Sequence, residues 1–384
     1  MDTIKVAVIG HRFMGRAHTH AYTDLSIFFN TEYKVEKSIL CANENDVFDL
    51  ADRWGYKKAV ENWEDVINVK DIDLIDIAAP SSMHAKIAIA AANAGKNVFC
   101  EKPLALTIDE AEKMVEAVEK NKVTSMVGFN YRRVPAIAFA KKLIKDGKIG
   151  QIHHFRGIYQ QDWLCDPAFP LAWRLRKSAA GYGSHGDLGA HVVDLARYLV
   201  GDIDEVMCVQ ETFIKQRLKT VYENGLQAKA GTEMGEVDVD DASSMMVRFC
   251  NQNIMGYIET TRYGNGHRNQ NRIEINGSKG SIIFDMEKMN ELEYFSSEDP
   301  DCLQGYKRIQ VGGDSFPYTA NWWGAGHIIG YGDTFVNQTY DLCNAIHKSE
   351  KVNPDFIDGL NCQYVLEAGQ ISAETQKWEK VKKY

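Results

Sequence analysis

The sequence predicts an α/β protein with an N-terminal, doubly wound parallel Rossmann sheet and a C-terminal α+β domain that contains an open, mostly antiparallel sheet. Short apolar strands alternate with helical segments through the first third of the 384 residues. After Asn130 the strand-like segments follow one another with few helices between them. A chain of this length suits two domains, which we place at 1–128 and 129–384.

The elements of the first domain follow from local patterns. The expected strands are short apolar runs at Lys5–Ile9, Val35–Cys41, Leu74–Ala79, Asn97–Cys100 and Val123–Gly128. The expected helices are Phe13–Tyr22, Asp46–Trp54, Met83–Ala94 and a further helix that ends at Lys120. Gly55 and Gly95 end two of these helices, and Thr107 with Glu110 predicts a capping box at the start of the last one.

The second domain is expected to be rich in consecutive strands joined by short turns. We predict these strands at Ile152–Gln160, Glu205–Ile214, Ala242–Phe249, Ile254–Arg262, Arg272–Ile275 and Ser281–Asp285. An open sheet covers one face with its own helices and leaves the other face free. We therefore expect a homodimer or homotetramer that is assembled through this free face.

Composition excludes several classes of protein. The net charge of −9 gives no electrostatic footprint for nucleic acid. The N-terminus has no basic segment followed by a long apolar run, so we expect no secretion signal. No apolar run is long enough to span a bilayer. The eight cysteines are scattered without a Cys-x-x-Cys pair, so we expect no metal site and a reducing, cytoplasmic location.

A glycine loop follows the first strand and precedes the first helix. Its sequence is Gly10-His11-Arg12-Phe13-Met14-Gly15. In the dinucleotide fingerprint the glycines provide a tight turn, close approach to the pyrophosphate and helix packing. Arg12 stands where the second glycine is expected, so its side chain either meets phosphate or points to solvent. We expect this loop to bind a dinucleotide at the start of the helix.

The end of the second strand bears on the choice of cofactor. NAD enzymes usually place an acidic residue there to bind the ribose diol. This chain has Asn43, which can serve, and Glu44, one position later. No arginine lies there to accept a 2′-phosphate, so the expected cofactor is NAD rather than NADP.

The tripeptide Glu101-Lys102-Pro103 follows a buried strand. Proline restricts the chain direction, and a fixed ammonium stabilises alkoxide character on an alcohol. A surface lysine after a strand is common, so Lys102 alone is weak evidence. The longer string that begins at Ile75 and includes Pro80, His84 and this tripeptide is far more specific.

A third motif surrounds Asp187 and His191. Helical spacing puts Asp187, His191 and Asp194 on one stripe, beside an apolar stripe that begins at Leu188. Gly189 is costly inside a helix, which suggests a close approach by another group. Histidine titrates near neutrality and can accept an alcohol proton. A solvated His/Asp ladder is the competing interpretation of this stretch.

Taken together, these motifs resemble the Gfo/Idh/MocA family of sugar and inositol dehydrogenases over nearly the whole chain. The string from Gly128 to Arg132 also carries the resemblance. The glycine loop and the segment from Asn321 to His327 are most similar to the family's branch of levoglucosan dehydrogenases and glucoside 3-dehydrogenases.

The resemblance implies a role for specific residues. Lys102, Asp187 and His191 would be catalytic, and Asp187 and His191 would also bind substrate. The implied NAD contacts beyond the glycine loop and Asn43 are Ala79, Pro80, His84, Glu101, Lys102 and Asn130. Flat aromatic rings suit a pyranose face, and charged or amide side chains bind its hydroxyls. The substrate contacts expected on this basis are Asn130, Arg132, Trp163, Arg174 and His327.

The resulting hypothesis is NAD-dependent oxidation of a secondary hydroxyl, at C3, of a pyranose sugar or an O- or C-linked glycoside. His191 takes the hydroxyl proton, Lys102 stabilises the oxyanion and Asp187 orients the substrate. Three alternatives remain open: an inositol dehydrogenase, a redox-neutral NAD-dependent enzyme that cleaves glycosides, and a non-catalytic NAD or sugar sensor.

Overall fold

The computed structural model describes residues 2–44, 46–224, 227–251 and 253–384. It divides into two compact units. The first unit contains residues Met1–Asn130 and Gly330–Leu360, and the second contains Tyr131–Ile329 and Asn361–Tyr384. The expected first domain, 1–128, lies within the first unit, which also contains Gly330–Leu360. The division at 1–128 and 129–384 stays a prediction.

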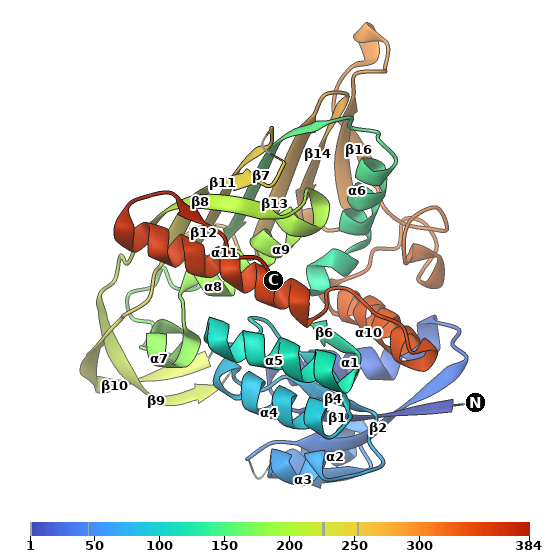
Figure 1. Ribbon diagram of the computed structural model, residues 1–384, viewed down its shortest axis with the longest axis vertical. Helices are drawn as coiled ribbons and strands as arrows, with labels where there is room; N and C mark the ends of the chain where they lie inside the picture. Colours follow the sequence, from blue (N-terminus) through green and yellow to red (C-terminus); the bar gives the residue numbers. More distant parts are fainter. Residues whose placement is uncertain (1, 45, 225–226, 252) are drawn as a thin grey trace. The chain divides into compact units, whose positions relative to one another are not determined.

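The first unit is built on a parallel, six-stranded sheet with the order β3-β2-β1-β4-β5-β6 (Figure 1). Its strands are β1 (Asp2–Ile9), β2 (Tyr33–Cys41), β3 (Lys58–Val60), β4 (Leu74–Ile77), β5 (Asn97–Cys100) and β6 (Ser125–Val127). All four residues of β4 are buried, as expected for a strand with both faces covered. This sheet confirms the doubly wound architecture, although the three-residue β3 had not been predicted.

Helices connect these strands. They are α1 (Phe13–Phe28), α2 (Val47–Trp54), α3 (Trp63–Ile67), α4 (Ser81–Asn93) and α5 (Ile108–Asn121). The predicted capping box is present, since Glu110 N donates to Thr107 Oγ1 and the Glu110 side chain accepts from the Thr107 amide. Gly55 ends α2 in the left-handed conformation at φ +75°. The helix α1 runs six residues beyond its expected end.

The returning segment adds α10 (Tyr331–Lys348) and the start of α11 (Phe356–Thr375) to the first unit. Aromatic contacts join α10 to α1: the ring centroids of Phe335 and His18 are 5.5 Å apart, and those of Tyr340 and Phe29 are 4.3 Å apart. This packing explains why the segment belongs with the nucleotide-binding sheet. No local sequence pattern indicated it.

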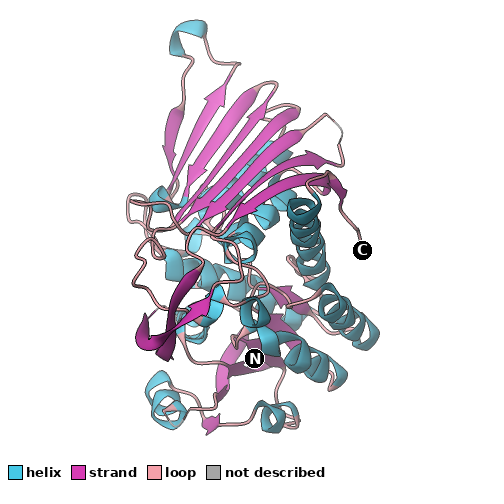
Figure 2. Cartoon of the chain, turned by 90° about the vertical axis from the view of Figure 1, so that its left-hand side faces the viewer, coloured by secondary structure: helices cyan, strands magenta, loops and turns pink. Residues whose placement is uncertain are grey.

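The second unit contains a large, open sheet (Figure 2). Its nine strands have the order β16-β15-β14-β13-β7-β12-β11-β8-β17. Only the β7–β12 pair is parallel among the pairings described for this sheet, so the prediction of a mostly antiparallel sheet is confirmed. The strands are β7 (Ile152–Gln160), β8 (Ile203–Glu211), β11 (Ala242–Phe249), β12 (Met255–Thr261), β13 (Gln270–Gly277), β14 (Gly280–Asp285), β15 (Glu291–Ser296), β16 (Lys307–Gln310) and β17 (Glu379–Lys380). A separate two-stranded sheet pairs β9 (Gln216–Asn224) with β10 (Gln227–Glu236). The last three strands of the large sheet and this hairpin had not been predicted.

One face of the large sheet is covered by helices of its own unit. Burial alternates along β11, β12 and β13, which is the pattern of a sheet with one buried face. Gly157 on β7 allows α9 to approach, because a Cβ at Gly157 would lie 2.3 Å from Val192.

The helices of this unit are α6 (Pro135–Lys145), α7 (Lys177–Ala180), α8 (Ser184–Asp187), α9 (Gly189–Leu199) and the remainder of α11. Short 3₁₀ turns lie at η1 (Asn130–Arg133), η2 (Trp173–Leu175), η3 (Met286–Lys288), η4 (Asp301–Leu303) and η5 (Thr319–Asn321). Among the described residues, no helix combines the length and apolarity needed to cross a membrane.

Candidate active site

The glycine loop of the first unit has the geometry that a dinucleotide requires. Gly10 adopts φ +110°, and a Cβ there would lie 2.3 Å from the Ala78 carbonyl oxygen. A Cβ at Gly15 would lie 2.0 Å from the Gly10 carbonyl oxygen. Both positions therefore need glycine: the first for its turn, and the other for close packing of α1 against the loop.

The start of α1 is suited to an anion. This 16-residue helix has no acidic residue in its first turn, and Arg12 at its N-cap makes no side-chain cap. Its first amide groups and its dipole favour negative charge. Phe13 is 49% exposed beside them. These residues fit the pyrophosphate of NAD.

Arg12 contacts an acidic residue. Its Nη2 lies 2.6 Å from Glu44 Oε1, just beyond the end of β2. His11 Nε2 lies 3.2 Å from the other Glu44 oxygen and 3.4 Å from Asp46. Asn43 is exposed beside this group. Glu44 is thus held by two cationic or polar partners, one position after Asn43 and close to the place where NAD enzymes use a carboxylate.

His84 contacts the loop that follows β4. The ring nitrogens of this histidine lie 2.9 Å from the Pro103 carbonyl oxygen and 3.0 Å from that of Ala79. Burial lowers the pKa of His84, and its contacts with the Ala79 and Pro103 carbonyls oppose this shift. The residue joins the loop at Ala79 and Pro80 to the Glu101-Lys102-Pro103 segment. Its predicted contact with the cofactor stays a prediction.

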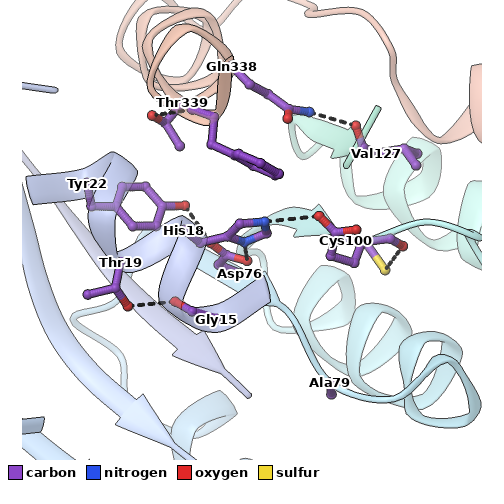
Figure 3. A network of polar contacts seen from close by, with 12 residues as sticks. Gly15, His18, Thr19, Tyr22, Asp76, Ala79, Cys100, Val127, Gln338 and Thr339 are labelled. Carbon is purple, nitrogen blue, oxygen red and sulfur yellow. Dashed lines mark hydrogen bonds and ion pairs between the residues drawn. The ribbon is translucent and has the colours of Figure 1, made fainter. Parts of the chain in front are cut away.

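Figure 3 shows a buried polar cluster that includes His18, Tyr22 and Asp76. The Glu101-Lys102-Pro103 segment begins at this cluster. Glu101 is buried, and its Oε1 lies 3.0 Å from His18 Nε2 on α1. Lys102 is half-buried, and its backbone amide donates to Glu101 Oε2 at 3.2 Å. Further along the chain, Asn130 is buried and donates from Nδ2 to Thr334 Oγ1 at 2.8 Å. The expected substrate and cofactor roles of Lys102 and Asn130 stay predictions.

In the second unit, Asp187 and His191 do not share one helix. Asp187 is the last residue of α8, and α9 begins at Gly189. The expected single helix is thus two helices, although Leu188 between them keeps helical backbone angles of φ −90° and ψ −40°. The common stripe of Asp187 and His191 stays a prediction. Gly189 starts a helix instead of interrupting one, and a Cβ there would meet its nearest neighbour at an ordinary 3.5 Å. The close approach that was expected at Gly189 is thus not found.

Asp187 is oriented by a buried arginine. Arg262 at the end of β12 is fully buried, and its Nη2 donates to Asp187 Oδ2 at 3.1 Å and to the Gly183 carbonyl at 3.0 Å. Its guanidinium also lies over the Trp163 ring, 5.6 Å from the centroid. The Asp187 side chain is 30% exposed. Arg262 was not predicted from the sequence, because it lies 75 residues from Asp187 in the chain.

His191 lies against a pair of tyrosines. Its ring stacks on Tyr131 with a centroid distance of 4.3 Å and lies 6.0 Å from Tyr159. The two tyrosine hydroxyls are 2.7 Å apart, and Tyr159 donates to Asn269 Oδ1. Aromatic packing restricts the orientation of the imidazole.

Further hydrogen bonds extend from Asn269 away from these tyrosines. Gln161 donates to the same Asn269 oxygen at 2.8 Å, and Trp163 Nε1 donates to Gln161 Oε1 at 2.9 Å. Sequence analysis missed Tyr131, Tyr159, Gln161 and Asn269. Only the position of Tyr131, inside a motif already singled out, offered a signal.

The remaining predicted substrate residues each contact other groups of the protein, and the Arg174 carbonyl accepts from Arg262 Nη1 at 3.2 Å. Arg132 is buried in a bidentate pair with Asp194, which lies on α9 three residues after His191. Arg174 stacks on Trp173, 4.3 Å from the ring centroid. His327 is exposed and contacts the Gly324 carbonyl within its own loop. The predicted contacts of Arg132, Arg174 and His327 with substrate stay predictions.

Both parts of the chain match established family models. Residues 4–129 match the oxidoreductase family with an NAD-binding Rossmann fold, and residues 137–283 match the GFO/IDH/MocA C-terminal domain. The chain is 41% identical to levoglucosan dehydrogenase of Pseudarthrobacter phenanthrenivorans over 384 residues, which covers 98% of each chain. It is 29% identical to myo-inositol 2-dehydrogenase of Thermotoga maritima, over 73% of this chain and 75% of that one.

Solved structures agree with these matches. A levoglucosan dehydrogenase in complex with NADH superposes with a TM-score of 0.94 at 39% identity, and all of both chains is covered. An oxidoreductase domain protein from Kribbella flavida gives the same TM-score at 41% identity, again over all of both chains. The similarity therefore extends through the glycine loop, the Glu101-Lys102-Pro103 segment and the residues around His191.

Proposed function

The chain belongs to the Gfo/Idh/MocA family of NAD-binding oxidoreductases, and we propose that it oxidises the C3 hydroxyl of a pyranose sugar or of an O- or C-linked glycoside. The similarity to levoglucosan dehydrogenase along almost the entire chain is the observation that carries this proposal. More distant similarity to an inositol dehydrogenase supports the broader class of sugar and polyol CH–OH groups.

NAD, when bound, supplies the hydride acceptor. Gly10, Gly15 and the start of α1 would hold its pyrophosphate, because the two glycines leave room for it and the first amide groups of a helix favour an anion. Glu44, or Asn43 beside it, would accept hydrogen bonds from the adenosine ribose. A carboxylate at this position repels a 2′-phosphate, which supports NAD over NADP.

In the proposed reaction His191 accepts the proton of the substrate hydroxyl. Its ring is held by Tyr131, which fixes its orientation before the substrate binds. Asp187 orients the substrate and supports His191; its own position is maintained by Arg262. Lys102 stabilises the negative charge that develops on the oxygen.

A substrate panel tests the reaction. Monosaccharides, anhydro-sugars, inositols and O- and C-glucosides are each incubated with NAD and NADP, and NADH absorbance and released aglycone are measured. Sustained NADH formation with a pyranose, and a 3-keto product by NMR, supports the proposal. Aglycone release without NADH indicates the redox-neutral reaction, inositol oxidation indicates a polyol enzyme, and NAD binding without any turnover indicates a sensor. Each of these three results contradicts the proposed oxidation of a pyranose at C3.

Variants test the residue roles. Lys102→Met and His191→Asn should each lower kcat by about 10²-fold or more, because each loses a charge or proton acceptor used in the transition state. NAD affinity, measured by fluorescence titration, should stay within about twofold, far below such catalytic effects. His153→Asn, on an exposed strand position, is the control. Near-normal kcat in Lys102→Met or His191→Asn contradicts the assignment.

We also propose a cytoplasmic homodimer or homotetramer. Val209, Met246 and Met255 are at least half exposed, and strand register puts them on the same, uncovered face of the large sheet. Burying such side chains favours association. The eight cysteines are free thiols, which supports a reducing compartment. Light scattering that gives a monomer contradicts the assembly.

A further inference from the structure

A buried histidine on α1 lies between two carboxylates that come from different strands. His18 is fully buried, and its Nδ1 lies 2.8 Å from Asp76 Oδ1 on β4. Its Nε2 lies 3.0 Å from Glu101 Oε1, directly after β5. Phe99 stacks on the imidazole at a centroid distance of 4.7 Å. His18 therefore connects the nucleotide-binding helix to the ends of two neighbouring strands.

The arrangement defines the charge state of His18. Each ring nitrogen faces a carboxylate oxygen, and an ionised carboxylate only accepts hydrogen bonds. Each carboxylate also accepts a second bond, from the Tyr22 hydroxyl to Asp76 and from the Lys102 amide to Glu101. Both ring nitrogens must then donate, so His18 is an imidazolium. Burial opposes this charge, but Asp76 and Glu101 outweigh burial and raise the pKa of His18 to about 10.

Glu101 in turn fixes the start of the Lys102 segment. Its Oε1 is held by His18, and its Oε2 accepts from the Lys102 backbone amide. The carboxylate lies over Gly128, where a Cβ would come within 2.4 Å of Oε1. A carboxylate enclosed on these sides has little freedom to rotate. Its orientation is therefore set by the cation on α1.

We propose that His18 is a positioning residue for Lys102, acting through Glu101. The imidazolium holds the Glu101 carboxylate, and this carboxylate holds the backbone from which the Lys102 ammonium extends. The inference rests on the proposed function in assigning Lys102 to the oxyanion. In this proposal α1 not only binds the pyrophosphate but also positions the Lys102 ammonium after β5.

The test compares two changes in the same cluster. His18→Gln removes the cation and can donate to only one of the two carboxylates. Tyr22→Phe is the matched control, because it removes one hydrogen bond to Asp76 but leaves the contact between His18 and Glu101. The measurements are thermal unfolding, NAD affinity, the split between kcat and KM, and competitive acetylation of Lys102 in the apoprotein, read by mass spectrometry against the exposed Lys113.

The expected result separates positioning from stability. His18→Gln should lower kcat at least tenfold, since misplacing a reacting group by about 1 Å can cost 10²-fold. KM for the sugar and NAD affinity should change little, and the acetylation rate of Lys102 relative to Lys113 should change by more than about threefold, the equivalent of half a pKa unit. Tyr22→Phe should leave kcat and the acetylation ratio unchanged even where it lowers the unfolding temperature.

A double-mutant cycle provides a second route should His18→Gln fold poorly. Glu101→Gln alone should reproduce the loss of kcat and the altered Lys102 labelling. Adding His18→Gln in that background should produce no further loss, because both act on one path. Three results would overturn the proposal. The first is unchanged Lys102 labelling in both single variants, and the second is an equal effect of His18→Gln and Tyr22→Phe. The third is full additivity of the kcat losses caused by His18→Gln and Glu101→Gln. A wild-type chain that oxidises no sugar would refute the proposed function, while the labelling would still test this inference.

Discussion

Replacing Asp194 by leucine tests whether Arg132 is held by a buried ion pair. The Arg132 guanidinium makes three contacts of 2.6–3.1 Å to Asp194, and both residues are less than 5% exposed. Asp194→Leu removes every acceptor in this pair while keeping a similar volume. The buried guanidinium then loses its main compensating charge.

The expected loss in the free energy of unfolding is large because the Arg132–Asp194 pair is buried away from water. Breaking a buried pair by removal of one partner costs about 3–5 kcal/mol. At about 2–4 °C per kcal/mol for a unit of roughly 150–250 residues, the unfolding temperature should fall by about 6–20 °C. The double variant Arg132→Met/Asp194→Leu should recover most of this stability, because no unpaired charge remains.

A second pair on the same helix provides the control. Arg197 also binds an aspartate, Asp202, with contacts of 2.9 and 3.0 Å, but the Asp202 side chain is 56% exposed. Asp202→Leu should cost no more than about 1 kcal/mol, since water replaces the lost partner.

The assay is urea and thermal unfolding followed by tryptophan fluorescence and circular dichroism. The reasoning is refuted if Asp194→Leu costs less than about 1 kcal/mol, or no more than Asp202→Leu. A double variant as unstable as Asp194→Leu itself would equally contradict it.

Three further predictions concern the first unit. Gly128→Ala should lower kcat by about 10-fold or more, because its Cβ would displace the Glu101 carboxylate; steady-state kinetics without a loss above twofold contradicts this. Glu44→Gln should raise the NADP/NAD ratio of kcat/KM by about 10-fold, since it frees Arg12 for a 2′-phosphate, and adding Arg12→Ala should abolish the gain; an unchanged ratio contradicts it. His18 has a folded pKa of about 10 against an ordinary 6.5, so between these values the folded state holds one proton more than the unfolded state. The stability advantage over His18→Gln should therefore be full below pH 6.5 and fall by up to about 1.4 kcal/mol per pH unit towards pH 10; urea titrations that show a constant or rising difference contradict this.

Local chemistry made much of the first unit predictable. A capping box needs only Thr107 and Glu110 three residues apart, and a left-handed turn needs only a glycine such as Gly55. The functional motifs are similarly local, since Gly10 and the Glu101-Lys102-Pro103 segment each lie at the end of a buried strand. Such features depend on neighbours within a few residues.

The missed features depend on contacts between distant residues. Arg262 reaches Asp187 across 75 positions, and Tyr131 meets Tyr159 only because η1 and β7 pack together. Periodicity predicted one helix through Asp187 and His191, but α8 ends and α9 begins on either side of Leu188. A pattern of period 3.6 continues across such a short break, so sequence alone does not reveal it.

The discontinuity of the first unit has a consequence for synthesis. About 200 residues separate Asn130 from the segment that supplies α10, and a ribosome adding roughly 5–20 residues per second needs about 10–40 s to make them. Throughout this interval the nascent nucleotide-binding sheet lacks Phe335 against His18 and the Gln338 bond to the Val127 carbonyl. The first part of the chain to emerge is thus among the last to complete its core, and chaperones have the longest access to it.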